Sequence, residues 1–94
     1  MAKNVPPSAG IVEADLHGMN RYQAKLTLEA ALRRAGREVY RIRVIHGYHG
    51  GTELQSLVRE EIAGNKKVLR WEVGLNPGET DLILREWTGV TKNV

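Results

Sequence analysis

The sequence predicts an α/β two-layer sandwich, in which two helices cover one face of a four-stranded mixed sheet. Three segments alternate apolar with charged residues, which is the pattern of strands with one buried and one wet face. Helical patterns long enough to act as crossovers separate these segments, so the first three strands are expected to run parallel, with right-handed connections. Only a short turn precedes the fourth strand, which should therefore run antiparallel to the third. The expected order is β-α-β-α-β-β.

The composition is that of one small globular domain. The chain has 94 residues, a net charge of +3 and no cysteine, so disulfides, thiolate catalysis and cysteine-ligated zinc are excluded. No secretory signal segment and no apolar run of the ~20 residues that span a membrane is found, so we expect a cytoplasmic monomer without membrane contact. The positive charge favours nucleic acid as partner. The domain is expected at 11–87, between tails at 1–10 and 88–94.

The first strand, Ile11–Leu16, is followed by a helix that begins at Asn20. Gln23 stands three residues after Asn20, which is the spacing of a capping box. Gly36 is expected to end the helix in a left-handed conformation. Apolar residues recur between these ends at helical spacing and should face the core: Ala24, Leu28, Ala31, Leu32 and Ala35.

A second strand, Val39–Ile45, leads into a helix that we expect Thr52 to cap. Gln55 again occupies the third position, and Gly64-Asn65 ends the helix. The apolar residues at helical spacing form the stripe that should be buried: Leu54, Leu57, Val58 and Ile62.

The last two strands, Val68–Leu75 and Thr80–Trp87, are joined by the turn Asn76-Pro77-Gly78. One face of the third strand should be apolar and point toward the helices: Leu69, Trp71, Val73 and Leu75. The aromatic residues Tyr22, Tyr40 and Trp71 are expected to be buried or half-buried.

All three histidines follow the carboxyl ends of the first two strands. His17 ends the first strand, and His46 and His49 follow the second. Ligands gather at such ends in parallel sheets, so the sequence predicts one crevice, which also contains Asp15. A histidine in this place could transfer a proton near neutral pH, or it could be bound only by backbone carbonyls. A zinc site of three histidines is a weaker alternative, because His46 and His49 would have to supply the usual ligand pair from a loop.

Asp15 has two interpretations. Its carboxylate could orient an imidazole or bind a divalent cation, Mg²⁺ or Mn²⁺. It could equally be a solvated side chain that balances Arg41 or Arg43.

The crevice is rich in glycine: Gly18, Gly47, Gly50 and Gly51. Glycine lets the backbone approach a phosphate, and the first N–H groups of the helix after Thr52 would point at the same anion. The alternative is a flexible turn with a good cap. The spacing is that of neither a P-loop nor a dinucleotide fingerprint, which argues against a mononucleotide site.

Three arginines, Arg41, Arg43 and Arg70, are predicted on the face of the sheet away from the helices. They could form a track for a phosphate backbone, or they could be ordinary surface residues paired with Glu13 and Glu72. In the loop after the second strand, Tyr48 could stack on an unpaired base.

The motifs Asp15-Leu16-His17-Gly18 and Val44-Ile45-His46-Gly47 resemble those of the Smr (small MutS-related) domain family. The segment Gly78–Leu84 is similar to a third motif of that family, a glycine-threonine-hydrophobic strand. The chain looks like a small stand-alone member. The loop departs from the family pattern, because His49 stands where the second glycine is expected.

The resemblance implies a fold like the C-terminal domain of translation initiation factor 3, with sheet order 1-2-4-3. It also implies an endonuclease or nickase that cleaves phosphodiester bonds in branched DNA or in RNA, in some members on the ribosome. Asp15, His17 and His46 would then be catalytic. The glycines, Tyr48, His49, Thr52 and the three arginines would bind nucleic acid.

Two functional hypotheses follow. In the first, the glycines hold the scissile phosphate and His17 or His46 moves the proton. RNA could then be cut through its 2′-hydroxyl without metal, whereas DNA would need water and more readily a divalent cation. In the second, the domain is a non-catalytic module that binds DNA junctions or ribosomal RNA. A protein-interaction domain that uses the wet face of the sheet is a third, weaker reading.

Overall fold

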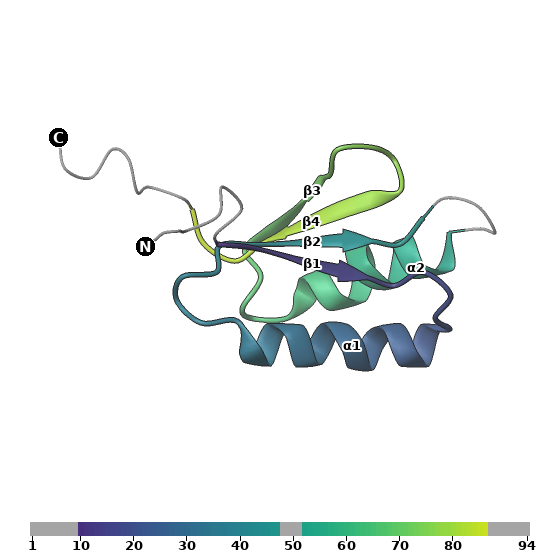
Figure 1. Ribbon diagram of the computed structural model, residues 1–94, viewed down its shortest axis with the longest axis horizontal. Coiled ribbons are helices and arrows are strands. Elements are labelled where there is room, and N and C mark those ends of the chain that lie inside the picture. The colour runs from purple at the N-terminus through teal and green to yellow at the C-terminus, as the bar shows by residue number, and fades with distance from the viewer. Residues whose placement is uncertain (1–9, 48–51, 87–94) are drawn as a thin grey trace, which may run out of the picture.

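Four strands form a mixed sheet in the order β1-β2-β4-β3 (Figure 1). In this computed structural model, β1 (Ile11–Asp15) runs parallel to β2 (Arg41–Ile45). β4 (Glu79–Ile83) lies between β2 and β3 (Arg70–Val73) and runs antiparallel to both. The predicted element order and the strand order implied by the family resemblance are both confirmed.

The structure describes residues 10–47 and 52–86. The predicted tails at 1–10 and 88–94 lie outside this range, except for Gly10. The loop residues Tyr48, His49, Gly50 and Gly51 lie outside it too, and their predicted contacts stay predictions.

Helix α1 (Arg21–Arg34) begins with the predicted capping box. The N–H of Gln23 donates to Asn20 Oδ1 at 2.8 Å, and the N–H of Asn20 donates back to Gln23 Oε1 at 3.0 Å. The left-handed stop predicted at Gly36 is wrong. The chain leaves the helix at Ala35 in an extended conformation, which requires no positive φ.

The second helical run has a mixed hydrogen-bond pattern. Four α-helical residues, α2 (Glu53–Ser56), continue into the π-helix η1 (Leu57–Glu61) and the 3₁₀ turn η2 (Ile62–Gly64). Thr52 precedes the run but its side chain makes no capping hydrogen bond, so that prediction is wrong. Its φ of −117° and ψ of 14° are not the extended values from which a side chain reaches the first turn.

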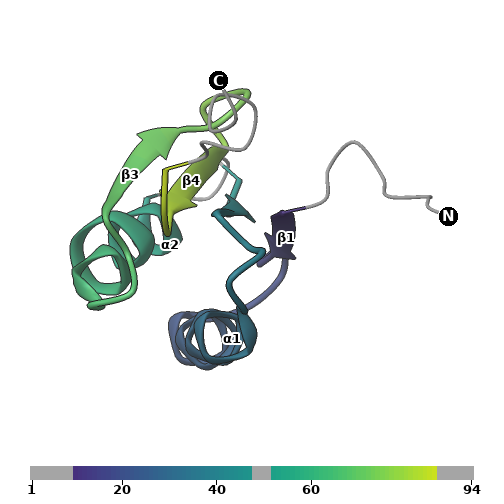
Figure 2. The same cartoon turned by 90° about the vertical axis from the view of Figure 1, so that its left-hand side faces the viewer.

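Both helical segments cover the same face of the sheet, and the other face is open (Figure 2). The predicted stripes of both helices contribute to the core between the layers. Its buried apolar residues are Ala14, Leu16, Ala24, Leu28, Leu32, Val39, Ile42, Val44, Leu57, Val58, Ile62, Val68 and Leu82. In the described ranges, no helix is long and apolar enough to cross a membrane.

The edge strand β3 points its apolar side chains to the helix side, as predicted, but leaves them exposed. Trp71 pairs with Leu82 and Val73 with Thr80, which fixes this direction, while Trp71 and Val73 remain 38% and 60% exposed. The guanidinium of Arg59 lies 4.4 Å from the ring centroid of Trp71 and covers part of it. Tyr22 is 69% exposed, so its predicted burial is wrong.

Candidate functional site

Two His-Gly turns, His17-Gly18 and His46-Gly47, lie side by side at the carboxyl ends of β1 and β2. The parallel register pairs Asp15 with Ile45, and one more hydrogen bond, from Leu16 N–H to the Ile45 carbonyl at 2.8 Å, continues the pairing past the strands. The sequence prediction that these two motifs meet at one edge of the sheet is thus confirmed.

The glycine in each turn has a left-handed backbone. The φ angle is +80° at Gly18 and +77° at Gly47, and a Cβ at either position would meet no atom of a described residue within 4 Å. The backbone conformation therefore calls for glycine at both positions. No described residue fills the space beside either glycine, so a ligand could reach their backbone.

Asp15 and His17 are both exposed, and the carboxylate fixes the turn. Asp15 Oδ1 accepts a hydrogen bond from the backbone N–H of His17 at 2.9 Å. This contact is an Asx-type turn within the motif. The carboxylate is engaged with the backbone, and the imidazole of His17 has no hydrogen bond to a described residue.

His46, in contrast, is 7% exposed, and both of its ring nitrogens have partners. Nδ1 lies 2.8 Å from the carbonyl oxygen of Gly47, and Nε2 lies 2.8 Å from the hydroxyl of Thr80. The carbonyl can only accept, so Nδ1 carries the proton. Arg59 Nε–H donates to the same Thr80 hydroxyl at 2.8 Å, and that hydroxyl can donate its own proton to His46 Nε2. The assignment gives a neutral imidazole.

The electrostatic surroundings agree with a neutral His46. Burial lowers its pKa, and the positive charge of Arg59 lowers it further. The hydrogen bond to the Gly47 carbonyl and the charge of Glu79 act in the opposite direction and do not offset burial.

Asp15 and His46 point to opposite faces of the sheet. Asp15 shares a register position and a face with Ile45, whereas His46 points to the helix side with Val44 and contacts Thr80. In the described part of the chain, no three His, Asp or Glu side chains group so that they could hold a metal ion. The three-histidine zinc alternative also needs His49, which lies outside the described residues.

Sequence reasoning missed Thr80 and Arg59 as residues of this site. Thr80 belongs to the third family-like motif, so a signal for it was present. The same motif brings Gly78, whose carbonyl accepts the N–H groups of His46 at 3.0 Å and Gly47 at 2.9 Å. Arg59 stands on the π-helical segment, and no motif marks it.

The three arginines of the open face are bound to carboxylates. Asp81, which is 1% exposed, accepts hydrogen bonds from Arg41 at 2.5 Å and from Arg43 at 3.2 Å. The hydrogen bond to Asp81, and then the negative charge of Asp81, raise the pKa of Arg43. Arg70 pairs with Glu72 at 2.9 Å and with Glu86 at 2.5 Å. The predicted alternative, in which these arginines pair with surface carboxylates, is thus confirmed for Glu72. The pairing with Asp81 was not predicted.

The helix start after Thr52 offers little to an anion in the described residues. Thr52 is exposed, and Glu53 places a carboxylate in the first turn of α2, where it competes for the N–H groups. The glycines that would complete this phosphate site, Gly50 and Gly51, lie outside the described residues.

Comparisons with known proteins agree with this geometry. The family model of the Smr domain matches residues 14–77, which is more than half of the chain. The crystal structure of the Smr domain of Thermus thermophilus MutS2 is similar, with a TM-score of 0.71 and 28% sequence identity over 80% of this chain and 99% of that one. No curated protein matches the chain in sequence. The Smr family is a nucleic-acid-binding, nuclease-type family, and the chain belongs to it.

Proposed function

We propose that the chain binds nucleic acid and cuts its phosphodiester bonds at the edge formed by Asp15, His17, Gly18 and Gly47. One observation carries the proposal: an exposed imidazole, an exposed carboxylate and two open left-handed glycines meet at the ends of two parallel strands. The glycines would let a phosphate lie against the backbone. His17 would take the proton from the attacking oxygen or give one to the leaving oxygen.

His46 has a different role in this proposal. Its Nδ1–H holds the carbonyl of Gly47, and its other nitrogen is occupied by Thr80, so it positions the glycine turn and transfers no proton. The proton transfer is thereby assigned to His17 alone.

The attacking group depends on the substrate. RNA provides its own 2′-hydroxyl, whereas branched DNA requires water. A divalent cation such as Mg²⁺, when bound, would activate that water, and Mg²⁺ is commonly held by one or two carboxylates with substrate phosphates. Asp15 fits as a single such carboxylate, since Oδ1 binds the backbone and Oδ2 has no hydrogen bond to a described residue.

The test is cleavage of labelled branched DNA and labelled single-stranded RNA, each with and without a chelator. His17→Ala should reduce cleavage by about 10²–10⁴-fold without changing the thermal midpoint, because the residue is exposed. Asp15→Asn is the matched variant. It retains an acceptor for the His17 N–H but loses the charge, so it should affect the chelator-sensitive reaction most. Wild-type cleavage by His17→Ala protein would overturn the assignment.

A non-catalytic module that binds DNA junctions or ribosomal RNA is the second candidate. One observation favours it: among the described residues, Asp15 binds a backbone N–H and no imidazole, so they assemble no acid–base pair. This candidate requires salt-sensitive binding by the wild-type protein. It also requires a cleavage signal no higher than that of the His17→Ala variant.

A further inference from the structure

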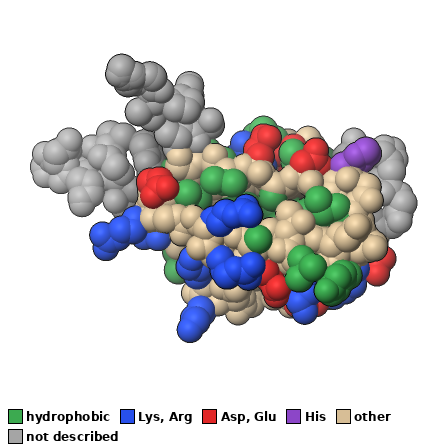
Figure 3. All heavy atoms as spheres, turned by 60° about the horizontal axis from the view of Figure 1, so that its bottom comes forward, with side chains coloured by type: hydrophobic (Ala, Val, Ile, Leu, Met, Phe, Trp, Pro, Cys, Tyr) green, Lys and Arg blue, Asp and Glu red, His purple; other side chains and the backbone are tan. Residues whose placement is uncertain are grey.

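Five basic residues lie at the end of the sheet opposite the His-Gly turns. They come from the last turn of α1, the turn after α1 and the turn after η2, and together we call them the basic end: Arg33, Arg34, Arg37, Lys66 and Lys67. In Figure 3, several Lys and Arg side chains lie on the left and in the centre of the view, and a histidine side chain lies on the right. All five are exposed.

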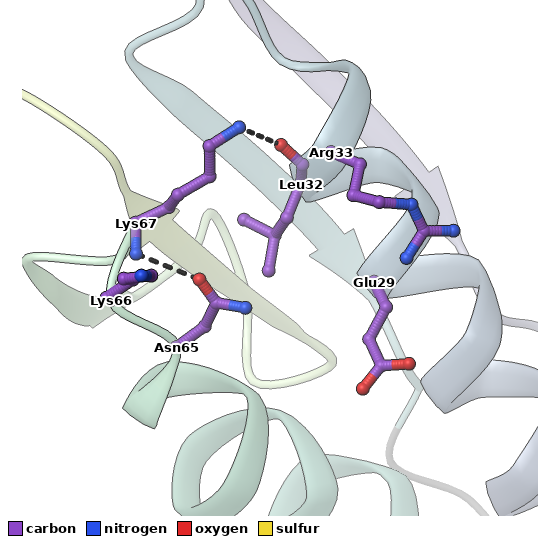
Figure 4. Close-up of a pocket in the computed structure, with 6 residues that line it drawn as sticks. All are labelled: Glu29, Leu32, Arg33, Asn65, Lys66 and Lys67. Atoms are coloured by element: carbon purple, nitrogen blue, oxygen red, sulfur yellow. Dashed lines mark hydrogen bonds between the residues drawn. The ribbon is translucent and has the colours of Figure 1, made fainter.

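Three residues of the basic end, Arg33, Lys66 and Lys67, line a hollow with a volume of about 420 Å³. Figure 4 shows Glu29 and Arg33 extending from α1 on one side of it, with Asn65, Lys66 and Lys67 on the other. One lysine holds this arrangement: Lys67 Nζ donates to the carbonyl of Leu32 at 2.6 Å, and its backbone N–H donates to Asn65 Oδ1 at 2.8 Å. Lys67 thus joins the two helical segments, and Arg33 and Lys66 line the hollow beside it.

The charges at this end are not neutralised by the described residues. Arg33, Arg34, Arg37 and Lys66 form no ion pair with any of them, whereas Arg21 and Lys25 on the same helix both pair with Glu61 at 2.7 Å. Glu29 lines the hollow, and Glu38 follows Arg37, so carboxylates are outnumbered here. The last turn of a helix favours cations, which accounts for Arg33 and Arg34 locally, but Arg37 and Lys66 lie outside that turn.

The open face of the sheet has the opposite balance. Its arginines are bound to carboxylates, and the acidic residues on this face outnumber them: Glu13, Asp15, Glu72, Glu79 and Asp81. The phosphate backbone of a polyanion would therefore be attracted more strongly by the basic end than by this face.

We propose that the basic end binds the phosphate backbone of a nucleic acid whose scissile segment reaches the His-Gly turns. This inference rests on the proposed function and specifies the second contact of the same polynucleotide. Helix α1 has 14 residues and runs between the two ends, so they lie about 20 Å apart. That distance corresponds to about six base pairs of duplex.

The test uses a double variant that removes two cations that line the hollow and have no ion pair in the described structure, Arg33→Gln/Lys66→Gln, and leaves the structural Lys67 in place. The matched control removes two cations of helix α1 that are paired with Glu61, Arg21→Gln/Lys25→Gln, and so changes net charge equally. Binding of labelled branched DNA and labelled hairpin RNA is measured between about 50 and 200 mM salt. The thermal midpoint of each variant confirms folding.

We expect the basic-end variant to lose affinity at least tenfold at low salt, and its log–log salt slope to become shallower by about 0.9 for each charge removed. The control should keep most of the wild-type slope. Equal losses in both variants, or no loss in the basic-end variant, would overturn the inference while leaving the proposed function intact. If the wild-type protein binds neither nucleic acid at low salt, the proposed function and the inference both fail.

Discussion

At the scale of single residues, the two strand-end histidines of the described chain have different chemistry. His17 is exposed, and its turn is held by Asp15, whereas His46 is buried and hydrogen-bonded at both nitrogens. The sequence motifs present the two residues as equivalent. The sequence of β2 nevertheless indicates that His46 is buried. His46 follows Ile42 and Val44 at intervals of two residues, so it lies on the same, buried face of the strand.

The buried His46 should make stability depend on pH. Its folded pKa is lowered, so between that value and about 6.5 the unfolded chain binds more protons than the folded one. The free energy of unfolding should therefore fall as pH decreases through this window, and this contribution should level off below the folded pKa. Urea unfolding between about pH 7.5 and 5 should give a shallower dependence for His46→Gln than for the wild type.

Other groups act in the same direction and must be controlled. The pKa of Glu61 is lowered by Lys25 and that of Glu86 by Arg70, so both contribute stability that is lost on acidification. These pairs remain in His46→Gln. His17→Gln is the control for removing an exposed histidine. If the unfolding free energy of His46→Gln depended on pH as steeply as that of the wild type, this would contradict a neutral His46 that is hydrogen-bonded at both ring nitrogens.

Thr80 should matter through its hydroxyl and not through its volume. Thr80→Val keeps the shape but leaves His46 Nε2 and Arg59 Nε without their partner, which should cost about 1–3 kcal/mol of unfolding free energy. Thr80→Ser retains the hydroxyl and should lose less. Chemical denaturation compares the two variants, and equal stabilities would mean that the hydrogen-bond chain contributes nothing.

At the scale of elements, β4 contributes more contacts to the sheet and to the site than its sequence pattern indicates. All five of its residues pair with β2 and four of them pair with β3. Within β4, Thr80 points to the helix side of the sheet and Asp81 to the open face. The buried ion cluster could have been predicted, because the sequence places the carboxylate of Asp81 between apolar residues of β4 while β2 carries Arg41 and Arg43. The mixed hydrogen bonding of the second helical run was not readable, because the same apolar stripe suits α-, π- and 3₁₀-helical turns.

The ion cluster of Asp81 supports a prediction about stability. Asp81→Asn should destabilise the fold by about 3 kcal/mol, because Arg41 and Arg43 then lose a buried counter-charge. Glu72→Gln, which alters more exposed pairs, should cost less than about 1 kcal/mol. The comparison is made by urea unfolding, and similar costs for the two substitutions would contradict a special role for Asp81.

At the scale of the whole molecule, the chain has chemically different ends. Element order and the meeting of the two His-Gly turns could be predicted from the sequence, because helix-length connections and strand periodicity determine them. The basic end could not, since Arg33 and Lys66 are far apart in sequence and come together only through the packing of α1 beside η2. The net charge of the chain does not indicate where on the surface the unpaired cations lie.

The distance between the two ends predicts a requirement for substrate length. Shortening the duplex on one side of the cut to less than about six base pairs should weaken wild-type binding to the level of the basic-end variant. The variant itself should be insensitive to this truncation, because it has already lost the contact. Binding curves for a series of duplex lengths test this, and parallel losses in both proteins would contradict a two-ended footprint.

The central position of β4 also has a consequence for how the chain is made. The strand synthesised last among the four occupies an inner place in the sheet. Until Glu79–Ile83 has emerged, β2 therefore lacks a partner on one edge, and β3 has no partner strand at all. The sheet can form only when nearly the whole domain has been made, because β2 and β4 pair across a long stretch of chain. A nascent chain paused before Glu79 would expose these unpaired strand edges and would be open to aggregation until translation resumed.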